Sequence, residues 1–171
     1  FANQKGGVGK STLAFHCAIA LCDAGAQVAV IDLDCGQQSL SYCLENRCRT
    51  ARFLETELPM PRQVVLQKQN GAQLSQEIAR IGSGCDFVII DLAGQDSLVA
   101  RFAIGLADKL VTPINCSTID IDLLGRFHPL TGQLQERGRF AQLVNALNDA
   151  RQSLGMNRAD WIVVKNRVRS A

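Results

Sequence analysis

The chain has 171 residues, of which 47% are hydrophobic and 20% are charged, and its formal net charge is +2. This profile is typical of one globular domain with a buried core, and it excludes a disordered chain. The small net charge excludes a strong overall attraction to nucleic acid or acidic lipid, so any such binding must depend on a local patch. No signal peptide or apolar run of transmembrane length is visible, and we therefore expect a cytoplasmic protein.

Segments of helical periodicity alternate with short apolar runs along the chain, an order that predicts an α/β fold. We expect a single domain, residues 1–171, with a mostly parallel central sheet and helices on both faces. The predicted helices cover residues 11–24, 39–46, 72–81, 97–107 and mainly 120–153, with a break near Pro129. The predicted strands cover residues 28–33, 64–66, 87–91, 109–112 and 161–164. We expect a loop over 49–62, and we expect Pro113 to end the strand before it.

Seven cysteines are scattered along the chain, and no two of them form a Cys-x-x-Cys pair. This odd number without a pattern favours reduced thiols over a disulfide framework or a zinc site. We expect them to serve as small buried hydrophobic residues. They are Cys17, Cys22, Cys35, Cys43, Cys48, Cys85 and Cys116.

A glycine-rich loop opens the chain directly before the first predicted helix, Lys5-Gly6-Gly7-Val8-Gly9-Lys10-Ser11-Thr12. Its glycines allow left-handed turns and a close approach of the backbone to a ligand. Successive N–H groups at the start of a helix attract an anion. Lys10 would add a charge for the β- and γ-phosphates, and Ser11 a hydroxyl for Mg²⁺. Thr12 would cap the helix and contact the α-phosphate. The segment therefore predicts a loop that binds nucleotide phosphates.

Acidic residues end two of the predicted buried strands. Val28–Leu33 runs into an Asp-x-Asp pair, Asp32 and Asp34, and the strand over 87–91 ends with Asp91. Because the carboxyl ends of parallel strands meet at one edge of a sheet, we expect these carboxylates to lie together. Mg²⁺ prefers oxygen ligands of this kind, so the sequence predicts a magnesium site beside the loop.

The loop departs from the ordinary Gly-x-x-x-x-Gly-Lys-Ser/Thr pattern, because Gln4 replaces the first glycine and Lys5 is an additional lysine. This combination resembles the deviant Walker A loop of the ParA/MinD superfamily of P-loop ATPases. Asp32-Leu33-Asp34 resembles switch I of that superfamily, Phe87–Asp91 its Walker B strand, and Leu92-Ala93-Gly94 its switch II.

The resemblance implies ATP and Mg²⁺ as cofactors and a role for each carboxylate. Asp34 would position the attacking water, and Asp91 would hold the hydration shell of Mg²⁺. Asp32 would support the loop and the metal, Ser11 would contact the metal directly, and Gly94 would donate an N–H to the γ-phosphate.

The same resemblance assigns three further residues. Lys10 would contact the phosphates within its own chain, whereas Lys5 would reach the phosphates of a partner subunit and act there like an arginine finger. Asn166 follows the last predicted strand and would read the adenine, since an amide carries both a donor and an acceptor. These roles imply an ATP-dependent homodimer that hydrolyses ATP slowly.

Later segments resemble the MipZ branch of the superfamily, whose members position the bacterial division plane. Val8 is alanine in that branch, and residues 126–157 match it poorly. The similar segments are residues 30–34, 37–39, 44–47, 85–91, 112–115, 120–125 and 160–167.

This branch implies an ATP-gated dimer that serves intracellular positioning, either of the division site or of chromosomes and plasmids. It also implies nonspecific DNA binding by the dimer, association with the nucleoid, and a ParB-like or division-protein partner. Phosphate contacts of that kind need only positive charge. Candidate arginines and lysines form three groups: Arg47, Arg49 and Arg52; Arg126, Arg137 and Arg139; and Lys165, Arg167 and Arg169.

Other functions of the same fold remain open. One alternative is an ATP-dependent metabolic ligase that resembles dethiobiotin synthetase or a cobyrinate amidase. A nitrogenase-reductase-like electron carrier is disfavoured, because no cysteine occurs between Cys85 and Cys116. A nucleotide-binding adaptor without hydrolysis is disfavoured by Lys5, Asp34 and Asp91.

The two ends of the sequence suggest that the chain is part of a longer protein. The chain begins without Met, and only Phe1-Ala2-Asn3 precedes the loop where a full strand normally stands. We therefore expect a fragment that lacks most of its first strand and a C-terminal portion.

Overall fold

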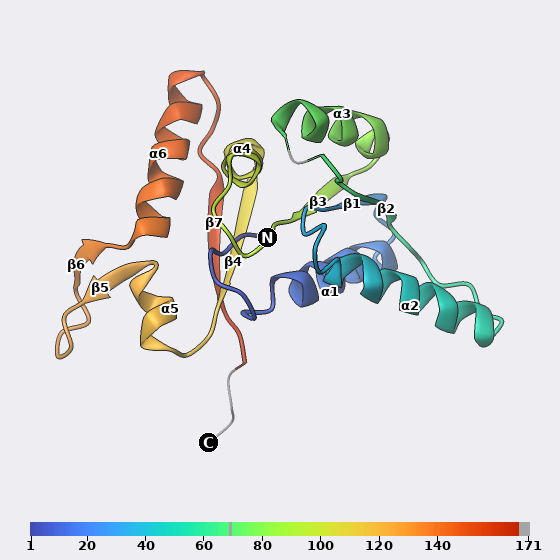
Figure 1. Ribbon diagram of the computed structural model, residues 1–171, viewed down its shortest axis with the longest axis horizontal. Coiled ribbons are helices and arrows are strands. Elements are labelled where there is room, and N and C mark those ends of the chain that lie inside the picture. The colour runs from blue at the N-terminus through green and yellow to red at the C-terminus, as the bar shows by residue number, and fades with distance from the viewer. Residues whose placement is uncertain (69, 168–171) are drawn as a thin grey trace. The chain divides into compact units, whose positions relative to one another are not determined.

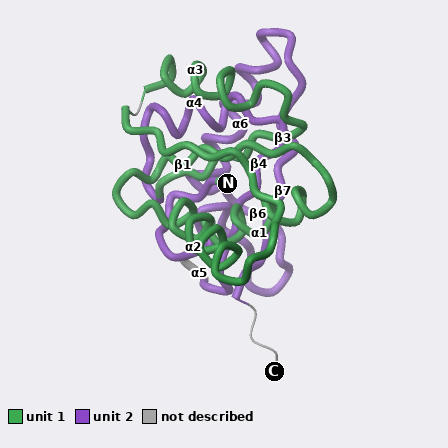
Figure 2. Tube along the Cα trace, turned by 90° about the vertical axis from the view of Figure 1, so that its right-hand side faces the viewer, with its two compact units in different colours: residues 1, 10–93 green, residues 2–9, 94–171 purple. Residues whose placement is uncertain are grey.

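The computed structural model describes residues 1–68 and 70–167 (Figure 1). The chain divides into two compact units, which Figure 2 distinguishes by colour. Unit 1 comprises Phe1 and Lys10–Ala93, and unit 2 comprises Ala2–Gly9 and Gly94–Ala171. No helix in the described part of the chain is long and apolar enough to cross a membrane.

Unit 1 is a three-stranded parallel sheet with strand order β2-β1-β3. Figure 1 shows α3 on one face of this sheet and α1 and α2 on the other. Every residue of β1 is buried, because it is the central strand and helices cover both faces. The elements are α1 (Lys10–Asp23), β1 (Val28–Asp32), α2 (Ser39–Phe53), β2 (Arg62–Val65), α3 (Gly71–Gly82) and β3 (Phe87–Asp91).

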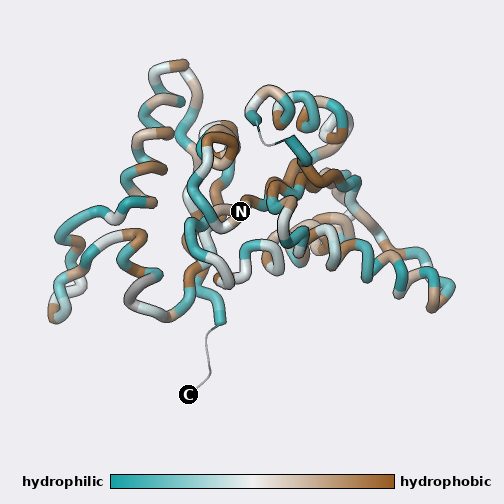
Figure 3. Tube along the Cα trace, viewed as in Figure 1, coloured by the Kyte–Doolittle hydropathy of each residue, from teal (hydrophilic) through white to brown (hydrophobic). Residues whose placement is uncertain are grey.

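The core of unit 1 lies between the sheet and helices α1 and α2. Ala14 and Ala18 are fully buried on α1, and their small side chains allow the helix to pack closely on the strands. The apolar strands appear as the brown centre of this unit in Figure 3. The buried cluster consists of Ala14, Ala18, Ile19, Cys22, Val28, Val30, Leu40, Leu44 and Ile89.

Helix α2 is longer than the sequence predicted. The expected end near residue 46 and the expected loop over 49–62 are wrong in their first part, because the helix continues to Phe53. Buried Leu44 and Ala51 attach successive turns to the core, and the chain holds no glycine or proline in this stretch before Pro59. Packing of one helical face thus outweighs the polar composition that favoured a loop.

Unit 2 is built on two parallel strands, β4 and β7, paired from Lys109 opposite Asp160 to Ile114 opposite Lys165. Helices α4 and α6 pack together, and Phe140 meets the Trp161 ring edge-on at 6.0 Å. The elements are α4 (Leu98–Leu106), β4 (Lys109–Ile114), α5 (Thr118–Asp122), β5 (Gly125–Phe127), β6 (Leu134–Arg137), α6 (Arg139–Ser153) and β7 (Asp160–Lys165). The pairings of β1, β2, β3, β4 and β7 are all parallel, which confirms the predicted fold class.

The predicted helix over 120–153 is wrong in its first half, where β5 and β6 form an antiparallel hairpin. Pro129 interrupts any helix there. Nδ1 of His128 instead accepts hydrogen bonds from the backbone N–H groups of Leu130 and Thr131. Gly132 supplies a left-handed turn with φ +67°, which returns the chain toward β6.

The prediction that Pro113 ends a strand is also wrong, because β4 continues to Ile114. Ala2 N–H donates to the Val111 carbonyl at 3.0 Å, and Nδ2 of Asn3 donates to the Pro113 carbonyl at 2.7 Å. The N–H and C=O of one strand residue point to the same side, so Pro113 lacks an N–H only on the side of Ala2 and Asn3. The ladder between β4 and β7 therefore loses no hydrogen bond.

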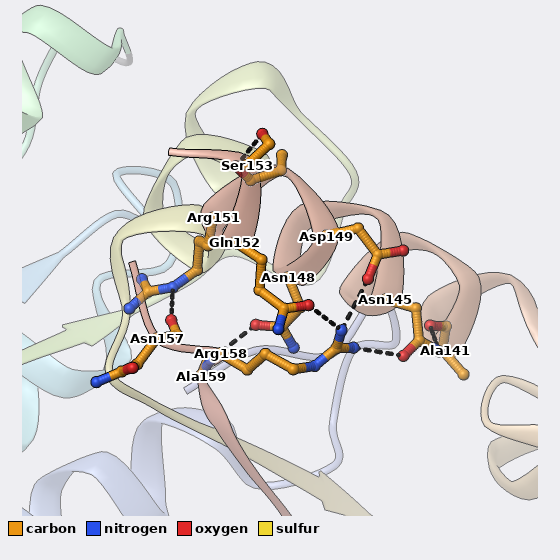
Figure 4. A network of polar contacts seen from close by, with 11 residues as sticks. Ala141, Asn145, Asn148, Asp149, Arg151, Gln152, Ser153, Asn157, Arg158 and Ala159 are labelled. Atoms are coloured by element: carbon orange, nitrogen blue, oxygen red, sulfur yellow. Dashed lines mark hydrogen bonds and ion pairs between the residues drawn. The ribbon is translucent and has the colours of Figure 1, made fainter. Parts of the chain in front are cut away.

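A polar network fixes the chain between α6 and β7 (Figure 4). Arg158 donates to Asp149 at 2.7 Å, to Gln152 at 2.9 Å and to Asn145 at 3.2 Å. The backbone N–H of Ala159 donates to Asn148 at 2.7 Å. These contacts hold the start of β7 against α6.

The expectation that the cysteines are buried is wrong for most of them. Only Cys22 is buried, and Cys17, Cys35 and Cys116 are exposed. Cys35 and Cys116 lie in loops that follow strands, where no helix covers them. All seven cysteines belong to the described residues, and none is in a disulfide bond.

Candidate functional site

Unit 1 brings charged residues together at the carboxyl edge of its sheet. Asp32 ends β1 and Asp91 ends β3, and the two lie opposite each other in the parallel register. Asp34 follows β1 in the loop toward α2, while Lys10 and Ser11 begin α1. The expected meeting of these carboxylates at one edge is therefore confirmed for Asp32 and Asp91.

Both carboxylate oxygens of Asp32 are engaged by protein donors. Oδ1 accepts the backbone N–H of Asp34 at 2.9 Å, and Oδ2 accepts the Ser41 hydroxyl at 2.9 Å and its N–H at 3.2 Å. Asp32 is buried, so these bonds compensate the lost hydration of its charge. Asp32 thus organises the connection from β1 to α2.

Asp34 is half-buried and shapes a turn of its own. Its Oδ1 accepts the N–H of Gln37 at 3.0 Å, and its carbonyl accepts the N–H of Gln38 at 2.8 Å. Gln38 has φ +47°, a left-handed conformation that precedes α2. This turn holds the Asp34 carboxylate near enough to Lys10 to affect its pKa.

Asp91 carries the least compensated charge of the site. Its side chain is 0% exposed, and no donor among the described residues has hydrogen-bond geometry at either carboxylate oxygen. Burial raises the pKa of Asp91 to about 6. The nearby Ser11 hydroxyl, the Phe1 ammonium and the Lys10 ammonium oppose this rise, and the Asp32 carboxylate adds to it. A buried carboxylate of this kind is expected to have a polar or cationic ligand.

Lys10 is buried, with 7% of its surface exposed. Burial lowers the pKa of its ammonium, while the carboxylates of Asp91 and Asp34 act in the opposite direction. The predicted phosphate lysine therefore lies close enough to Asp91 and Asp34 for both carboxylates to raise its pKa. Thr12 lies exposed in the next position of α1.

The glycine half of the loop belongs to unit 2. Gly7 has φ +72° and Gly9 has φ +93°, so the predicted left-handed turns are confirmed for these two glycines, whereas the φ of Gly6 is not positive. A Cβ added to Gly6 or Gly7 would meet nothing within 4 Å, and both residues are exposed. An exposed glycine loop can bind an anion when its backbone N–H groups point toward it.

Lys5 pairs with a residue of its own unit, because its ammonium donates to Oδ1 of Asp120. Asp120 is 0% exposed, and its Oδ2 accepts the Asn115 N–H at 2.8 Å. Burial alone would raise the pKa of Asp120, but the bonds from Lys5 and Asn115 outweigh it and lower the pKa. Lys5 is therefore the counter-ion of a buried carboxylate.

Asn166 follows β7 and contacts the glycine half of the loop. Its backbone N–H donates to the Ile114 carbonyl at 2.7 Å, and its side-chain Nδ2 donates to the Val8 carbonyl at 2.9 Å. Val8 is fully buried. Gly94, the predicted γ-phosphate contact, lies half-buried in a bend of unit 2.

Three residues that position this site were not predicted. Asp120 holds Lys5, Ser41 holds Asp32, and Asn3 accepts the Lys5 N–H at 2.9 Å through its Oδ1. Asn3 was detectable in principle, because it is a polar residue in an otherwise apolar position before the loop. Asp120 and Ser41 carry no such signal, since a polar residue near a helix start is usually a cap.

Metal binding by protein side chains alone does not fit this site. Among residues 1–68 and 70–167, no group of three or more His, Cys, Asp or Glu side chains could hold a metal ion. The donor set of Ser11 and Asp91 does suit Mg²⁺, which takes one or two protein oxygens and completes its shell with water and phosphate oxygens. The orphaned oxygens of Asp91 support this fit.

The family model of ATPase MipZ matches residues 1–171. The chain belongs to the MipZ family. A curated relative, an uncharacterised protein of Pseudomonas putida, is 25% identical over 90% of this chain and 70% of its own length. The match over the whole chain agrees with the resemblance of the MipZ segments and the deviant loop.

Solved structures with a similar fold include ParA/MinD-type proteins. A chain of the MinC:MinD cell division complex of Aquifex aeolicus has a TM-score of 0.60 and 20% identity, with 98% of this chain and 67% of that chain covered. ParA of pNOB8 bound to nonspecific DNA has a TM-score of 0.54 and 14% identity, with 99% and 87% covered.

An enzyme of metabolism shares the fold as well. Cobyrinic acid a,c-diamide synthase of Mycobacterium smegmatis, with bound ADP and magnesium, has a TM-score of 0.59 and 20% identity over 98% of this chain and 74% of that chain. At these identities the similarity shows the fold, and the family match is what separates this MipZ-family chain from the synthase.

The uncompensated Asp91 carboxylate predicts that Asp91→Asn stabilises the ligand-free protein at neutral pH. The folded-state pKa of about 6 exceeds the ordinary 3.8, so ionisation of Asp91 costs up to about 3 kcal/mol of folding free energy above pH 6. As the pH falls toward 4, the folded wild type takes up the proton and this cost disappears. Urea unfolding at pH 7.5 and pH 4 should therefore show a stabilised variant only at the higher pH. Equal stabilities at pH 7.5 would contradict the assignment.

Proposed function

We propose that this MipZ-family protein binds Mg-ATP and hydrolyses it slowly, as an ATP-gated dimer switch for positioning inside the cell. The observation that supports this most strongly is Asp91, a fully buried carboxylate. The Ser11 hydroxyl and the Lys10 ammonium lie near enough to lower its pKa, yet no described donor meets hydrogen-bond geometry at its oxygens. A charge in that condition is costly unless a ligand compensates it. Mg²⁺ bound with the phosphates of ATP is the ligand that suits both the carboxylate and the hydroxyl.

Each residue then has a defined task in the proposed reaction. Lys10 and the N–H groups of Gly6, Gly7 and Gly9 bind the phosphate oxygens. Ser11 and Asp91 hold Mg²⁺, which when bound neutralises charge on the phosphates. Asp32 has both oxygens on protein donors, so we assign it to orienting the switch loop.

Asp34 is the proposed water-positioning residue. It is half-buried and lies in a turn fixed by Gln37 and Gln38, so its carboxylate is held in place before the ligand arrives. Gly94 would contribute an N–H to the γ-phosphate. Phosphoryl transfer needs this kind of positioning more than it needs covalent chemistry by the protein.

An ATP-dependent metabolic ligase is the second candidate function, because a diamide synthase has a similar fold. That similarity is one of fold, whereas the MipZ match covers the whole chain. The additional Lys5 also favours the switch, because a self-contained phosphate loop already has Lys10. A ParB-like or division-protein partner fits the same proposal, since the similar MinD was solved in complex with MinC.

Lys10→Ala should abolish Mg-ATP binding, and Asp34→Ala should retain it while hydrolysis stops. The first variant removes a cation from the phosphates, and the second removes only the water-positioning carboxylate. Isothermal titration and phosphate release would measure the two effects. We expect micromolar binding, about −8 kcal/mol, for wild type and Asp34→Ala. Wild-type affinity in Lys10→Ala would exclude the proposed site.

We extend the proposal to Lys5 as a group that acts on the nucleotide of a partner subunit. Within its own unit Lys5 neutralises buried Asp120, so Lys5→Ala would leave that charge without its cation. Breaking a fully buried pair costs about 3–5 kcal/mol. We expect about 1–3 kcal/mol here, because 36% of the Lys5 side chain is exposed. A test of Lys5 therefore needs Asp120→Asn as a matched background.

Lys5→Ala/Asp120→Asn should fold as stably as Asp120→Asn alone and bind ATP within a few-fold of wild type, but neither dimerise nor hydrolyse. Mixed with Asp34→Ala subunits, it should regain part of the ATPase activity, because one composite site then has Asp34 from one chain and Lys5 from the other. Mass photometry and phosphate release would follow pairing and turnover. If the mixed subunits form dimers and bind ATP but release no phosphate, the trans role of Lys5 is ruled out.

Nonspecific DNA binding by the dimer is the remaining part of the proposal. Several candidate basic residues are already neutralised, as Arg126 by Glu136 and Arg49 by Glu45. Arg169 lies outside the described residues. The described part of the chain shows no ion pair for Arg52, Arg137, Arg139, Lys165 or Arg167. Arg137 and Arg139 are exposed and close in sequence, as are Lys165 and Arg167, and we choose the first pair for the test.

Arg137→Ala/Arg139→Ala should weaken DNA binding of the ATP-bound protein and flatten its salt dependence, by roughly one unit of slope for each DNA phosphate that is no longer neutralised. The matched control is Arg80→Ala/Arg101→Ala, which removes two arginines that are paired with Glu77 and Asp96. Fluorescence anisotropy across a salt series would measure both. Equal losses in the two variants would show that only net charge matters, and the assignment to Arg137 and Arg139 would fall.

A further inference from the structure

Asn166 is fixed from two sides where β7 ends. Its backbone N–H donates to the Ile114 carbonyl at 2.7 Å, which ties it to the end of β4. The opposite end of β7 is held by the Arg158 network and by the bond from Ala159 to Asn148 (Figure 4). The Asn166 side chain therefore starts from an anchored backbone.

The side-chain amide of Asn166 meets the phosphate loop at two neighbouring residues. Nδ2 donates to the Val8 carbonyl at 2.9 Å. A Cβ added to Gly9 would lie 2.2 Å from Nδ2, a distance that real side chains do not tolerate. The amide thus occupies the space that any side chain at position 9 would need.

We propose that Asn166 is a positioning residue that clamps Val8 and Gly9 in the phosphate-binding conformation of the loop. This inference rests on the proposed function, since it concerns the same phosphates. It differs from the role that the sequence resemblance implied, in which Asn166 reads the adenine. The amide nitrogen has two hydrogens, and one of them is directed at the backbone carbonyl of Val8 in the loop.

The clamp would reduce the entropy that a glycine-rich loop loses when it binds phosphate. Glycine loses more conformational freedom on ordering than any other residue, so such a loop binds phosphate well only when it is held in advance. Gly6 and Gly7 have no neighbour within 4 Å of a built Cβ, and Lys5 is held through Asn3 and Asp120. Asn166 restrains the loop after these glycines.

Inorganic tripolyphosphate separates clamping from base reading, because it has the phosphates and no base. In the full chain with Mg²⁺, Asn166→Ala should weaken tripolyphosphate and ATP by the same factor, roughly three- to tenfold for the removal of one hydrogen bond. Asn166→Asp should weaken both further, since a carboxylate would face the Val8 carbonyl and the phosphates. Asn157→Ala, the same substitution at an exposed asparagine of unit 2, is the control and should change neither affinity.

Isothermal titration gives a clear decision between the two roles. If Asn166→Ala weakens ATP but leaves tripolyphosphate unchanged, Asn166 reads the base and the clamp is wrong. Unchanged affinity for both ligands would equally overturn it. A wild-type protein that binds neither ligand would instead refute the proposed function itself. Each variant should still unfold in one cooperative thermal transition, as Asn157→Ala does, which excludes a general loss of structure.

A double-variant cycle tests the contact with Gly9 independently. Gly9→Ala should weaken tripolyphosphate because its Cβ collides with the Asn166 amide and because φ +93° disfavours alanine. Removing the amide relieves the collision, so Gly9→Ala/Asn166→Ala should bind at least as tightly as Gly9→Ala alone. If the two effects simply multiply, the residues act separately and the clamp is refuted.

Discussion

The buried carboxylate of Asp91 is the constraint on which the proposed site of unit 1 depends. It stands at the end of β3 opposite Asp32, and the two differ in one respect that decides their roles. Ser41 and the Asp34 backbone compensate the charge of Asp32. At Asp91 no donor in the described part of the chain meets hydrogen-bond geometry, and the Ser11 hydroxyl and the Phe1 and Lys10 ammonium groups oppose the rise of its pKa only in part. The buried charge of Asp91 therefore destabilises the protein when no ligand is bound. A bound cation would remove this cost, and the free energy so recovered would contribute to its binding.

The parts of the fold that were predictable are those in which local pattern and packing agree. Strands β1 and β3 are short apolar runs that end in aspartate, and their bounds differ little from the prediction. The hairpin of β5 and β6 was missed because it depends on a turn held by His128 and Gly132, in a segment whose composition also suits a helix. Pro113 was misjudged because the missing N–H of a proline ends a strand only if the neighbouring segment needs that hydrogen bond. The neighbouring segment here is Ala2–Asn3, and Asn3 donates to the Pro113 carbonyl instead.

In the candidate site, too, the residues that local sequence defines were predicted, and those that depend on long-range contacts were not. Lys10, Ser11, Asp34 and Asp91 were named from a motif that is contiguous or lies at a strand end, and their roles stay predictions. The structure buries Lys10 and Asp91 and holds Asp34 in a turn. The partners that position the loop come from far along the chain. Asp120 lies 115 residues from Lys5, and Asn166 lies 158 residues from Val8. Single-sequence reasoning cannot pair residues over such separations, because the pairing is determined by which strands become neighbours.

Lys5 illustrates how such a long-range interaction changes the meaning of a motif residue. A lysine that acts on a partner's phosphates must leave Asp120, and Asp120 is 0% exposed. Its charge would then require another cation, a proton or exposure to water. In the proposed dimer switch, association would have to offset the rupture of the Lys5–Asp120 ion pair as well as gain the new interaction of Lys5. A lysine that is already paired within its own chain would then disfavour association in the absence of ATP phosphates, which is the behaviour that the proposed switch requires.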